Sequence, residues 1–402
     1  MPRCTGKTKD GNRCLRDATK LSTKKCWQHG RKKPKIKTKS ASSSTKSGVS
    51  SRDVSIQAEA KETKIDIGFS RTLDMKKSRK LPYRETRGEI RLNIHIGQRK
   101  LLLSEIEFLT LYGDLADLVV YAGAAHGTHI KYLSELFPMH YFDLYDPAHF
   151  IVKETDKITI FNGYFMNENA ESYQDEATLF ISDIRSVQKQ TTDKGDISDE
   201  WEGEIIQNME MQAKWAEVMN PKMAMFKFRL PYNPGQTKYF PGEIYWQVWA
   251  PQASTETRLI TNKYEKNTIY DHDTYNDICF RFNRITRSQW YPHDIPLDEV
   301  PGLDHCYDCY TEIYILNEYL KKFHKSDYTT QKARDQQIVN MMNKITEELG
   351  RSSRLNQPPH GLYPLLKDRE EKKKLLESES DKYQKKYTQK QTKLKKTKHF
   401  RA

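Results

Sequence analysis

The chain has 402 residues and a formal net charge of +13, a length that accommodates one large domain or two ordinary ones with a buried core. No apolar run is long enough to cross a bilayer, and the basic, cysteine-bearing start lacks the pattern of a secretory signal. These features exclude a helical membrane protein and a secreted disulfide scaffold, and they predict a soluble intracellular protein.

The net positive charge of the chain comes from its two ends. Residues 1–63 carry 17 Lys and Arg against 5 Asp and Glu, and residues 367–402 carry 14 against 6. A total of +13 therefore leaves −7 for residues 64–366. Any non-specific attraction to nucleic acid should come mainly from the ends, through neutralisation of phosphates.

Three cysteines and a histidine near the start have the spacing of a small metal site, C-x9-C-x11-C-x2-H. They are Cys4, Cys14, Cys26 and His29. Thiolates and imidazole suit tetrahedral Zn²⁺, and residues 1–30 are too few to fold by apolar burial alone. We predict a zinc knuckle over residues 1–30; the alternative is a basic arm with incidental cysteines. Residues 31–63, rich in Lys and Ser, predict a disordered linker.

Helix and strand patterns alternate over residues 64–366. Apolar residues at helical spacing predict helices over 98–111 and 199–218. Apolar runs predict strands over 118–122, 141–145, 158–161, 178–182, 223–228, 242–249 and 258–260. This alternation indicates an α/β fold with a largely parallel sheet covered by helices on both faces. The charged residues 367–402 predict a tail that is disordered or transiently helical.

A glycine-rich turn joins the strand at 118–122 to the start of a helix. Gly123 and Gly127 allow a sharp turn and a close approach of a ligand. Asp146 ends the next apolar run, where an acidic residue commonly binds ribose hydroxyls. No Lys-Ser or Lys-Thr pair follows the glycines, so the segment is not a P-loop. The pattern predicts a nucleoside-containing cofactor; the alternative is an ordinary strand-to-helix turn.

Four charged residues are expected at one end of this sheet. Asp183 and Lys227 lie at or near the ends of predicted strands. Glu256 follows the apolar run 244–250, and Lys100 lies at the start of the first core helix. Each alone would be an ordinary surface charge. Their common position at the carboxyl ends of the strands indicates a ligand site.

Five segments of the chain occur in the same order in one known family. They are Gly-Gln-Arg-Lys-Leu-Leu-Leu-Ser-Glu-Ile-Glu-Phe-Leu (97–109), Val-Val-Tyr-Ala-Gly-Ala-Ala-His-Gly-Thr-His-Ile-Lys-Tyr-Leu (119–133), Leu-Phe-Ile-Ser-Asp-Ile-Arg-Ser (179–186), Lys-Phe-Arg-Leu-Pro-Tyr (227–232) and Ala-Pro-Gln-Ala-Ser-Thr-Glu-Thr-Arg-Leu (250–259). The chain thereby resembles the poxvirus-type cap-specific mRNA (nucleoside-2'-O-)-methyltransferases of large cytoplasmic DNA viruses, some of which also serve as poly(A) polymerase regulatory subunits. The resemblance implies a Rossmann-like, S-adenosyl-L-methionine-dependent methyltransferase domain over residues 64–366.

The resemblance implies a catalytic tetrad of Lys100, Asp183, Lys227 and Glu256. In the family, the counterpart of Lys227 takes the proton from the ribose 2'-hydroxyl, which requires a pKa lowered toward neutrality. The positive charge of Lys100 is expected to contribute to that lowering, while the two carboxylates orient the amine. The residues that the resemblance places around the cofactor are Tyr121, Gly123, Ala125, Gly127, Thr128, His129 and Asp146.

The resemblance also implies a site for the methylated guanine of the cap. Tyr232 matches an aromatic residue that stacks on this base in the family, and Phe69 is the expected aromatic on the opposite face. Two acidic residues that bind the guanine edge in the family fall on Pro234 and Asn276 here. The chain therefore departs from the family pattern at the cap site.

A second group of potential metal ligands, His305-Cys306-x2-Cys309, lies in an aromatic-rich segment and lacks an obvious fourth ligand. We therefore predict that these residues pack in the core.

The resemblance thus implies methylation of the 2'-hydroxyl of the first transcribed nucleotide of capped mRNA, in the host cytoplasm or in the virion. One alternative is a non-catalytic, RNA-binding processivity subunit that assembles with the catalytic subunit of a viral poly(A) polymerase. Another is a 2'-O-methyltransferase that acts on a different RNA. The presence of all four tetrad residues favours catalysis.

Overall fold

The computed structural model describes residues 68–83, 94–185, 199–251 and 254–349. The predicted zinc ligands Cys4, Cys14, Cys26 and His29 lie outside the described residues, as do the linker 31–63 and the tail 367–402. Among the described residues, no helix has the length and apolar character needed to cross a membrane.

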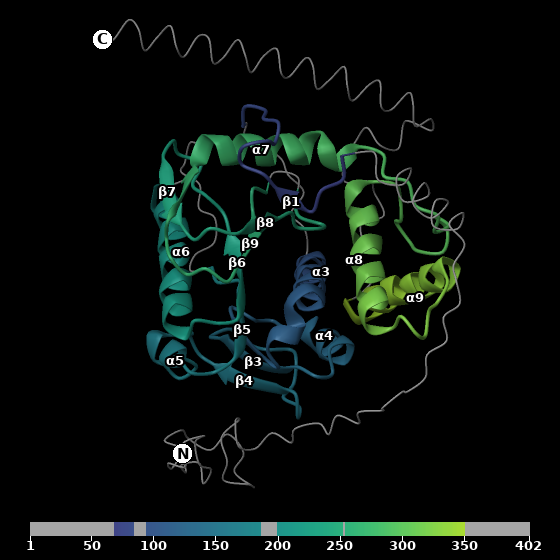
Figure 1. Cartoon of the computed structure of the whole chain (residues 1–402), viewed down its shortest axis with the longest axis horizontal. Coiled ribbons are helices and arrows are strands. Elements are labelled where there is room, and N and C mark those ends of the chain that lie inside the picture. Colours follow the sequence, from purple (N-terminus) through teal and green to yellow (C-terminus); the bar gives the residue numbers. More distant parts are fainter. Residues whose placement is uncertain (1–67, 84–93, 186–198, 252–253, 350–402) are drawn as a thin grey trace, which may run out of the picture. The chain divides into compact units, whose positions relative to one another are not determined.

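The centre of the fold is an eight-stranded sheet with the order β1-β8-β9-β6-β5-β2-β3-β4 (Figure 1). Its strands are β1 (Thr72–Leu73), β2 (Leu118–Ala122), β3 (Tyr141–Asp146), β4 (Ile158–Asn162), β5 (Thr178–Ser182), β6 (Met223–Phe228), β8 (Glu243–Tyr245) and β9 (Thr257–Thr261). In their order across the sheet, β4, β3, β2, β5 and β6 are parallel to one another. Strands β9, β8 and β1 continue the sheet beyond β6 in antiparallel pairing. Two further strands, β7 (Gln236–Tyr239) and β10 (Thr268–Asp271), form a separate antiparallel pair.

The predicted strands of the parallel half are confirmed, because these strands are largely buried and therefore appear as continuous apolar runs. The strand predicted over residues 242–249 is wrong in length, since β8 ends at Tyr245. Beyond it, Trp249 has a φ of 59°, which is incompatible with an extended strand. The residues described between β8 and β9 form no helix, and these two strands pair as antiparallel neighbours.

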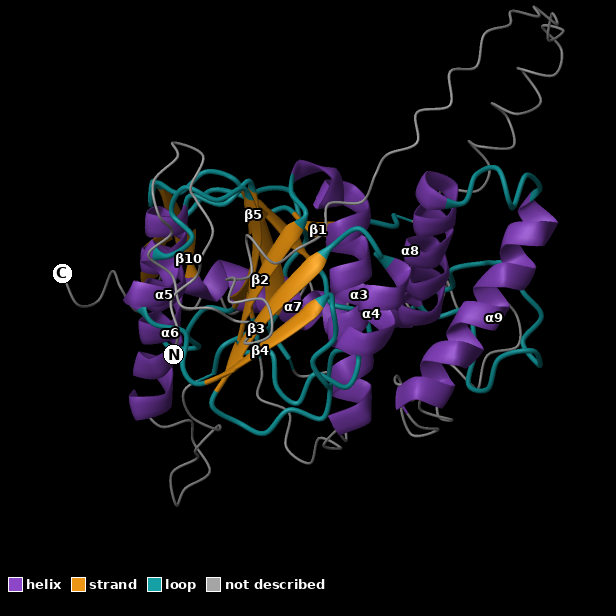
Figure 2. Ribbon diagram, turned by 90° about the horizontal axis from the view of Figure 1, so that it is seen from below, coloured by secondary structure: helices purple, strands orange, loops and turns teal. Residues whose placement is uncertain are grey.

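Helices lie on both sides of the sheet, which confirms the predicted α/β class. They are α3 (Ile94–Tyr112), α4 (Ile130–Leu136), α5 (Asn167–Glu171), α6 (Asp199–Met219), α7 (His272–Arg284), α8 (Tyr307–Phe323) and α9 (Gln331–Leu349), with short 3₁₀ turns η1 (Gly113–Leu115) and η2 (Thr286–Ser288). Helices α5 and α6 flank one side of the sheet, and α3, α4, α8 and α9 flank the other (Figures 1 and 2).

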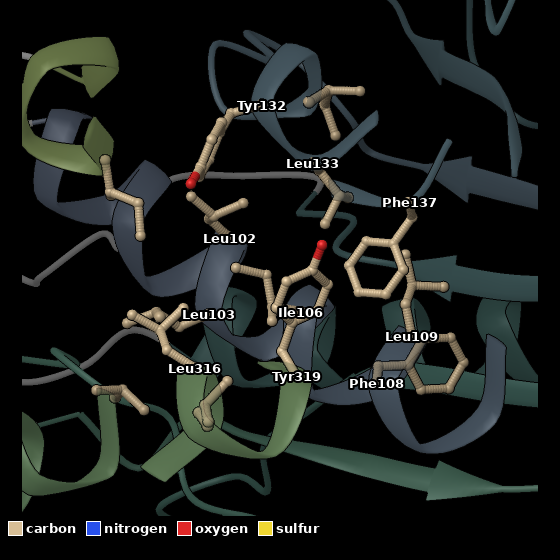
Figure 3. Close-up of a cluster of buried hydrophobic side chains, with 14 of the residues drawn as sticks. Leu102, Leu103, Ile106, Phe108, Leu109, Tyr132, Leu133, Phe137, Leu316 and Tyr319 are labelled. Carbon is tan, nitrogen blue, oxygen red and sulfur yellow. The ribbon is translucent and has the colours of Figure 1, made fainter. Parts of the chain in front are cut away.

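Helix α3 is held by a buried apolar cluster that it shares with α4 and α8 (Figure 3). Leu102 and Ile106 of α3 are fully buried, as are Leu133 of α4 and Leu316 of α8. Burial of each such side chain contributes about 1.5–3 kcal/mol. The packing therefore fixes the helix from which Lys100 projects.

The strand order reverses at β2, which has β3 on one side and β5 on the other. In such sheets, ligands bind in the crevice at the carboxyl ends of the strands next to this reversal. Gly123, Asp146 and Asp183 all lie at these carboxyl ends, since they follow or end β2, β3 and β5. The fold thus positions the predicted site at one edge of the sheet.

Candidate active site

The structure brings the four predicted tetrad residues together. Asp183 directly follows β5, and Lys227 is the last residue but one of β6. The amine Nζ of Lys227 lies 3.1 Å from Oδ1 of Asp183 and donates to the Asp183 carbonyl oxygen at 2.9 Å. Lys100 Nζ lies 2.7 Å from Oε1 of Glu256. Two lysines and two carboxylates therefore form neighbouring ion pairs at the sheet edge.

Two arginines complete this network and were not predicted. Arg258 is 3% exposed, and its guanidinium lies 2.6 Å from Oδ1 of Asp183 and 3.4 Å from Oε1 of Glu256. Arg185 lies 3.1 Å from Oε2 of Glu256, with a side chain that is 56% exposed. Alternate residues of a strand point to the same face, so the spacing placed Arg258 on the same face as Glu256 but did not indicate its contact with Asp183.

Burial lowers the pKa of the Lys227 amine to about 8. The carboxylates of Asp183 and Glu256 oppose this shift, and the positive charges of Arg185 and Arg258 assist it. Lys100, which was expected to supply that assisting charge, is instead paired with Glu256. An amine with a pKa near 8 is partly neutral at physiological pH, and only the neutral form can accept a proton.

Both carboxylates of the network are ionised at neutral pH. Burial alone would raise the pKa of Asp183, but the charges of Lys227 and Arg258 outweigh it and lower this pKa below its usual value. Burial likewise opposes ionisation of Glu256, yet Lys100, Lys227 and Arg258 hold its pKa well below the usual range. The two carboxylates can therefore orient the Lys227 amine and stabilise its charged form. The network offers a proton acceptor, Lys227, and contains no nucleophilic Ser or Cys side chain.

A cavity opens beside Lys227 between α6 and the strand ends. Its polar lining includes Glu204, Asn208 and Gln212 of α6, together with Arg185 and Arg229. Two arginines in the lining of a cavity suit a ligand that carries phosphates.

The glycine-rich turn requires glycine at two positions. Gly123 has a φ of +82°, and a Cβ there would lie 2.8 Å from the backbone of Asp183. Gly127 has a φ of +69°, and its Cβ would lie 2.9 Å from Val152. The turn is therefore packed tightly against the residues that follow β5 and β3.

The N–H groups of this turn are directed to acceptors within the protein. Gly123 donates to the Tyr145 carbonyl oxygen at 2.8 Å. Ala125 donates to Oδ2 of Asp146 at 3.1 Å, and Thr128 donates to Oε1 of Gln98 at the same distance. A phosphate cradle needs such groups to point at the ligand. The turn thus fits a nucleoside better than a nucleotide.

Two predicted cofactor residues have side chains in a buried network beneath the turn. The imidazole of His129 lies between Gln98 Oε1, 2.7 Å from Nδ1, and the Glu105 carboxylate, 2.9 Å from Nε2. The Tyr121 hydroxyl donates to the same carboxylate at 2.9 Å. These side chains connect the turn to α3, so they support its position. Gln98 and Glu105 were missed, although polar residues in an apolar helix are a signal for such a network.

An aromatic stack lies near the strand end that carries Lys227. The ring of Tyr83 stacks on that of Tyr232 with centroids 4.6 Å apart and an interplanar angle of 22°. Oδ1 of Asp277 accepts the backbone N–H of Tyr83 at 2.6 Å, and the Arg229 guanidinium lies 4.7 Å from the Tyr232 ring centroid. Tyr83, and not the predicted Phe69, is thus the residue whose ring stacks on Tyr232 in the structure.

Phe69 lies in a different aromatic cluster. Its ring contacts four tyrosine rings, those of Tyr291, Tyr307, Tyr310 and Tyr314. Tyr83 was missed because only its position in the folded chain, far in sequence from Tyr232, distinguishes it from other tyrosines.

Asn276, the second position at which the chain departs from the family pattern, is 2% exposed and donates through Nδ2 to the Pro231 carbonyl oxygen at 2.8 Å. Its Oδ1 has no hydrogen-bond partner among the described residues. The carboxylate of Glu202 accepts the backbone N–H groups of Tyr232 and Asn233, each at 2.9 Å. Glu202 thus brings an acidic group to the backbone of Tyr232, in the loop that contains Pro234.

Comparison with known proteins gives consistent matches. The sequence matches the model of the family described as "Poly A polymerase regulatory subunit" over residues 73–349. It is 29% identical over 221 residues to the "Cap-specific mRNA (nucleoside-2'-O-)-methyltransferase" of Myxoma virus (strain Lausanne), and equally to that of strain Uriarra. These alignments cover 48% of this chain and 62% of each relative, so the chain spans less than two thirds of the length of the curated relatives it matches. The family match, in contrast, covers well over half of the sequence and includes all four clustered charged residues, and the chain therefore belongs to the Poly A polymerase regulatory subunit family.

Proposed function

We propose that residues 64–366 form an S-adenosyl-L-methionine-dependent methyltransferase domain with a Rossmann-like sheet. Its substrate would be the ribose 2'-hydroxyl of the first transcribed nucleotide of capped mRNA. The main support is Lys227, a buried amine with a pKa of about 8 that is held by Asp183 at the carboxyl edge of the sheet. The name of the Myxoma virus relatives supports the choice of substrate.

The residues at the strand reversal fit a cofactor that has a ribose but no phosphate. Asp146 accepts N–H groups from Ala125 and Ala148, one on each carboxylate oxygen. Each oxygen keeps a second acceptor position, which a ribose hydroxyl can use. When bound, S-adenosyl-L-methionine supplies a methyl group on a cationic sulfonium. Because the sulfur leaves as a neutral thioether, the transfer needs neither a metal ion nor a covalent intermediate with the protein.

In this proposal, Lys227 receives the proton of the 2'-hydroxyl as its oxygen attacks the methyl group. Asp183 and Glu256 keep the amine oriented and stabilise it after it gains the proton. Most of the acceleration would come from alignment of the reacting atoms, which well-oriented sites supply without a nucleophile. Arg185 and Arg229 would hold phosphates of the RNA beside the cavity.

The experiment that tests this function measures transfer of a labelled methyl group to otherwise identical RNAs with and without a methylated cap. Nuclease digestion then identifies the modified nucleotide. Methylation of the first nucleotide only on capped RNA supports the proposal. Equal methylation of uncapped RNA favours the alternative of a different RNA substrate, and no methylation of either RNA favours a non-catalytic role.

We expect Asp146→Ala to weaken binding of S-adenosyl-L-methionine by about tenfold to 150-fold. The physical reason is that a hydrogen bond to a charged acceptor contributes about 1.5–3 kcal/mol. Isothermal titration calorimetry measures the affinity. Asp117→Ala is the matched control, because Asp117 is exposed and precedes β2 at the opposite edge of the sheet. Equal affinities of the two variants would argue against the cofactor site.

Tyr83 and Tyr232 would bind the methylated guanine as the two walls of a slot. Their rings are stacked on each other at 4.6 Å, so Tyr83 must move away to admit a base. A base stacked on an aromatic side chain contributes about 1–3 kcal/mol, and a cationic base adds an attraction to the ring face.

We therefore expect Tyr232→Ala and Tyr83→Ala each to weaken binding of a methylated cap analogue by about 5- to 150-fold. Fluorescence titration with the methylated and unmethylated nucleotides measures this effect. Phe69→Ala removes an aromatic ring from the separate tyrosine cluster and should leave cap affinity unchanged. The reverse pattern, with loss in Phe69→Ala alone, would contradict this assignment of the slot.

A second candidate function is regulation of a poly(A) polymerase, which the description of the matched family favours. In that role, the chain would assemble with a viral polymerase catalytic subunit and retain RNA through its basic ends. The two roles are compatible, because the tetrad and the basic ends lie in different parts of the sequence. Longer poly(A) tails in the presence of the Lys227→Met chain would support a regulatory role that does not depend on methyl transfer.

A further inference from the structure

The start of α8 holds three potential metal ligands that the proposed function does not use. A carboxylate oxygen of Asp304 and the sulfurs of Cys306 and Cys309 all lie within 4.8 Å of one another. Both cysteines are fully buried reduced thiols within the apolar core, as the sequence predicted. Oδ1 of Asp304 accepts the Cys306 N–H at 2.8 Å at the start of α8, which holds this carboxylate beside both sulfurs.

The local backbone turns both sulfurs into hydrogen-bond acceptors. Cys306 is the N-cap of α8, and its Sγ accepts the N–H of Cys309 at 3.5 Å. The Sγ of Cys309 accepts the N–H of Asp304 at 3.3 Å. Cysteine is not among the residues preferred at an N-cap, where oxygen side chains are better acceptors. A bound metal ion would take both sulfurs as thiolates and release their protons.

The donor set also selects the kind of metal. Two thiolates and a carboxylate suit Zn²⁺, which accepts sulfur and oxygen ligands at a C-x2-C spacing. Ca²⁺ and Mg²⁺ require mostly oxygen ligands in larger number. We propose that Asp304, Cys306 and Cys309 bind one Zn²⁺, with water in the fourth position on the half-buried side of Asp304.

Such a metal ion would stabilise the segment that leads to Glu256. Asp308, in the first turn of α8, accepts the Trp249 backbone N–H at 3.1 Å and pairs with Arg287 at 2.6 Å. Arg287 in turn donates to the Ala250 carbonyl oxygen at 2.7 Å. A fixed start of α8 therefore helps to position the chain that enters the active site. The role is structural, since none of the three ligands contacts the reacting groups.

The test uses the full chain with Cys4, Cys14 and Cys26 replaced by Ser, because that motif is predicted to bind zinc independently. Elemental analysis should find one zinc per chain in this background and none after the further change Cys309→Ala. Cys279→Ala is the matched control, since Cys279 is also buried, at 1% exposure, but lies outside the group. It should retain the zinc.

Reconstitution of the background chain with Co²⁺ tests the site without the Cys309→Ala variant, in case that variant does not fold. The background chain should then show thiolate-to-cobalt charge-transfer absorption, and a chelator should lower its melting temperature until zinc is restored. The proposal would be wrong if the chain contained no zinc and showed no such absorption, and if both thiols could be alkylated after unfolding. The three residues would then serve core packing and bind no metal. A Cys306–Cys309 disulfide found by mass spectrometry in protein purified under reducing conditions would equally overturn the proposal.

Discussion

Replacing Lys227 with methionine is expected to abolish detectable methyl transfer while leaving the affinity for S-adenosyl-L-methionine nearly unchanged. Methionine keeps much of the side-chain length but removes the amine that would accept the proton. Loss of a positioned general base typically lowers a rate by about 10²- to 10⁴-fold. Single-turnover assays with labelled cofactor measure the rate, and titration calorimetry measures the affinity.

The pH dependence provides an independent check of the same residue. Because only the neutral amine accepts a proton, the wild-type rate should rise with pH through about 8, the pKa of Lys227. Lys227→Arg should also be inactive, since a guanidinium does not lose its proton near neutral pH. A rate for Lys227→Met close to that of the wild type, or a wild-type rate that is flat around pH 8, would remove Lys227 from the mechanism.

The same pKa predicts how Lys227 affects stability. Its folded-state pKa is lowered from 10.5 to about 8, so between these values the unfolded chain binds a proton that the folded chain does not. Stability from this group therefore rises with pH across that window, and the charged amine costs about 3 kcal/mol at neutral pH. Urea denaturation of the wild-type chain at a series of pH values between 8 and 10.5 measures this rise.

The parallel half of the sheet was predictable because its buried strands consist mainly of apolar residues. Every residue of β2 and β5 is buried, so both strands appear as uninterrupted apolar runs with clear ends. Strand β1 has two residues, which are too few to form a pattern, and β8 has three, so the apolar run that predicted a strand over 242–249 was longer than the strand itself. Helix α9, in contrast, has buried residues at helical spacing, among them Ile338, Met342 and Ile345, so the sequence did contain a signal for it.

The site was predictable wherever a residue followed a recognisable strand or matched a family segment. Asp183 and Lys227 met both conditions. The contacts of Arg258 depend on the antiparallel register between β6 and β9, in which it lies opposite Lys227. That register is a property of tertiary pairing, because nothing in either strand alone specifies the partner or its offset. The stack of Tyr83 on Tyr232 has the same origin.

Replacing Arg258 with methionine is expected to destabilise the protein by about 3–5 kcal/mol, because it removes one partner from a buried charge network. The guanidinium is 3% exposed and contacts both Asp183 and Glu256. Without it, Oδ1 of Asp183 keeps the Lys227 amine, and Glu256 keeps Lys100 and the more exposed Arg185. Urea denaturation at pH 7 measures the loss of stability.

The substitution should also change the pH dependence of catalysis in a defined direction. The charge of Arg258 lowers the pKa of Lys227, so its removal should raise that pKa and move the rate profile to higher pH. Arg185→Met is the matched control: Arg185 also lowers this pKa, but its side chain is 56% exposed, so stability should change by less than about 1 kcal/mol. If Arg258→Met instead moves the profile to lower pH, the main effect of Arg258 is on Asp183 and Glu256, and the low pKa of Lys227 must then come from burial alone.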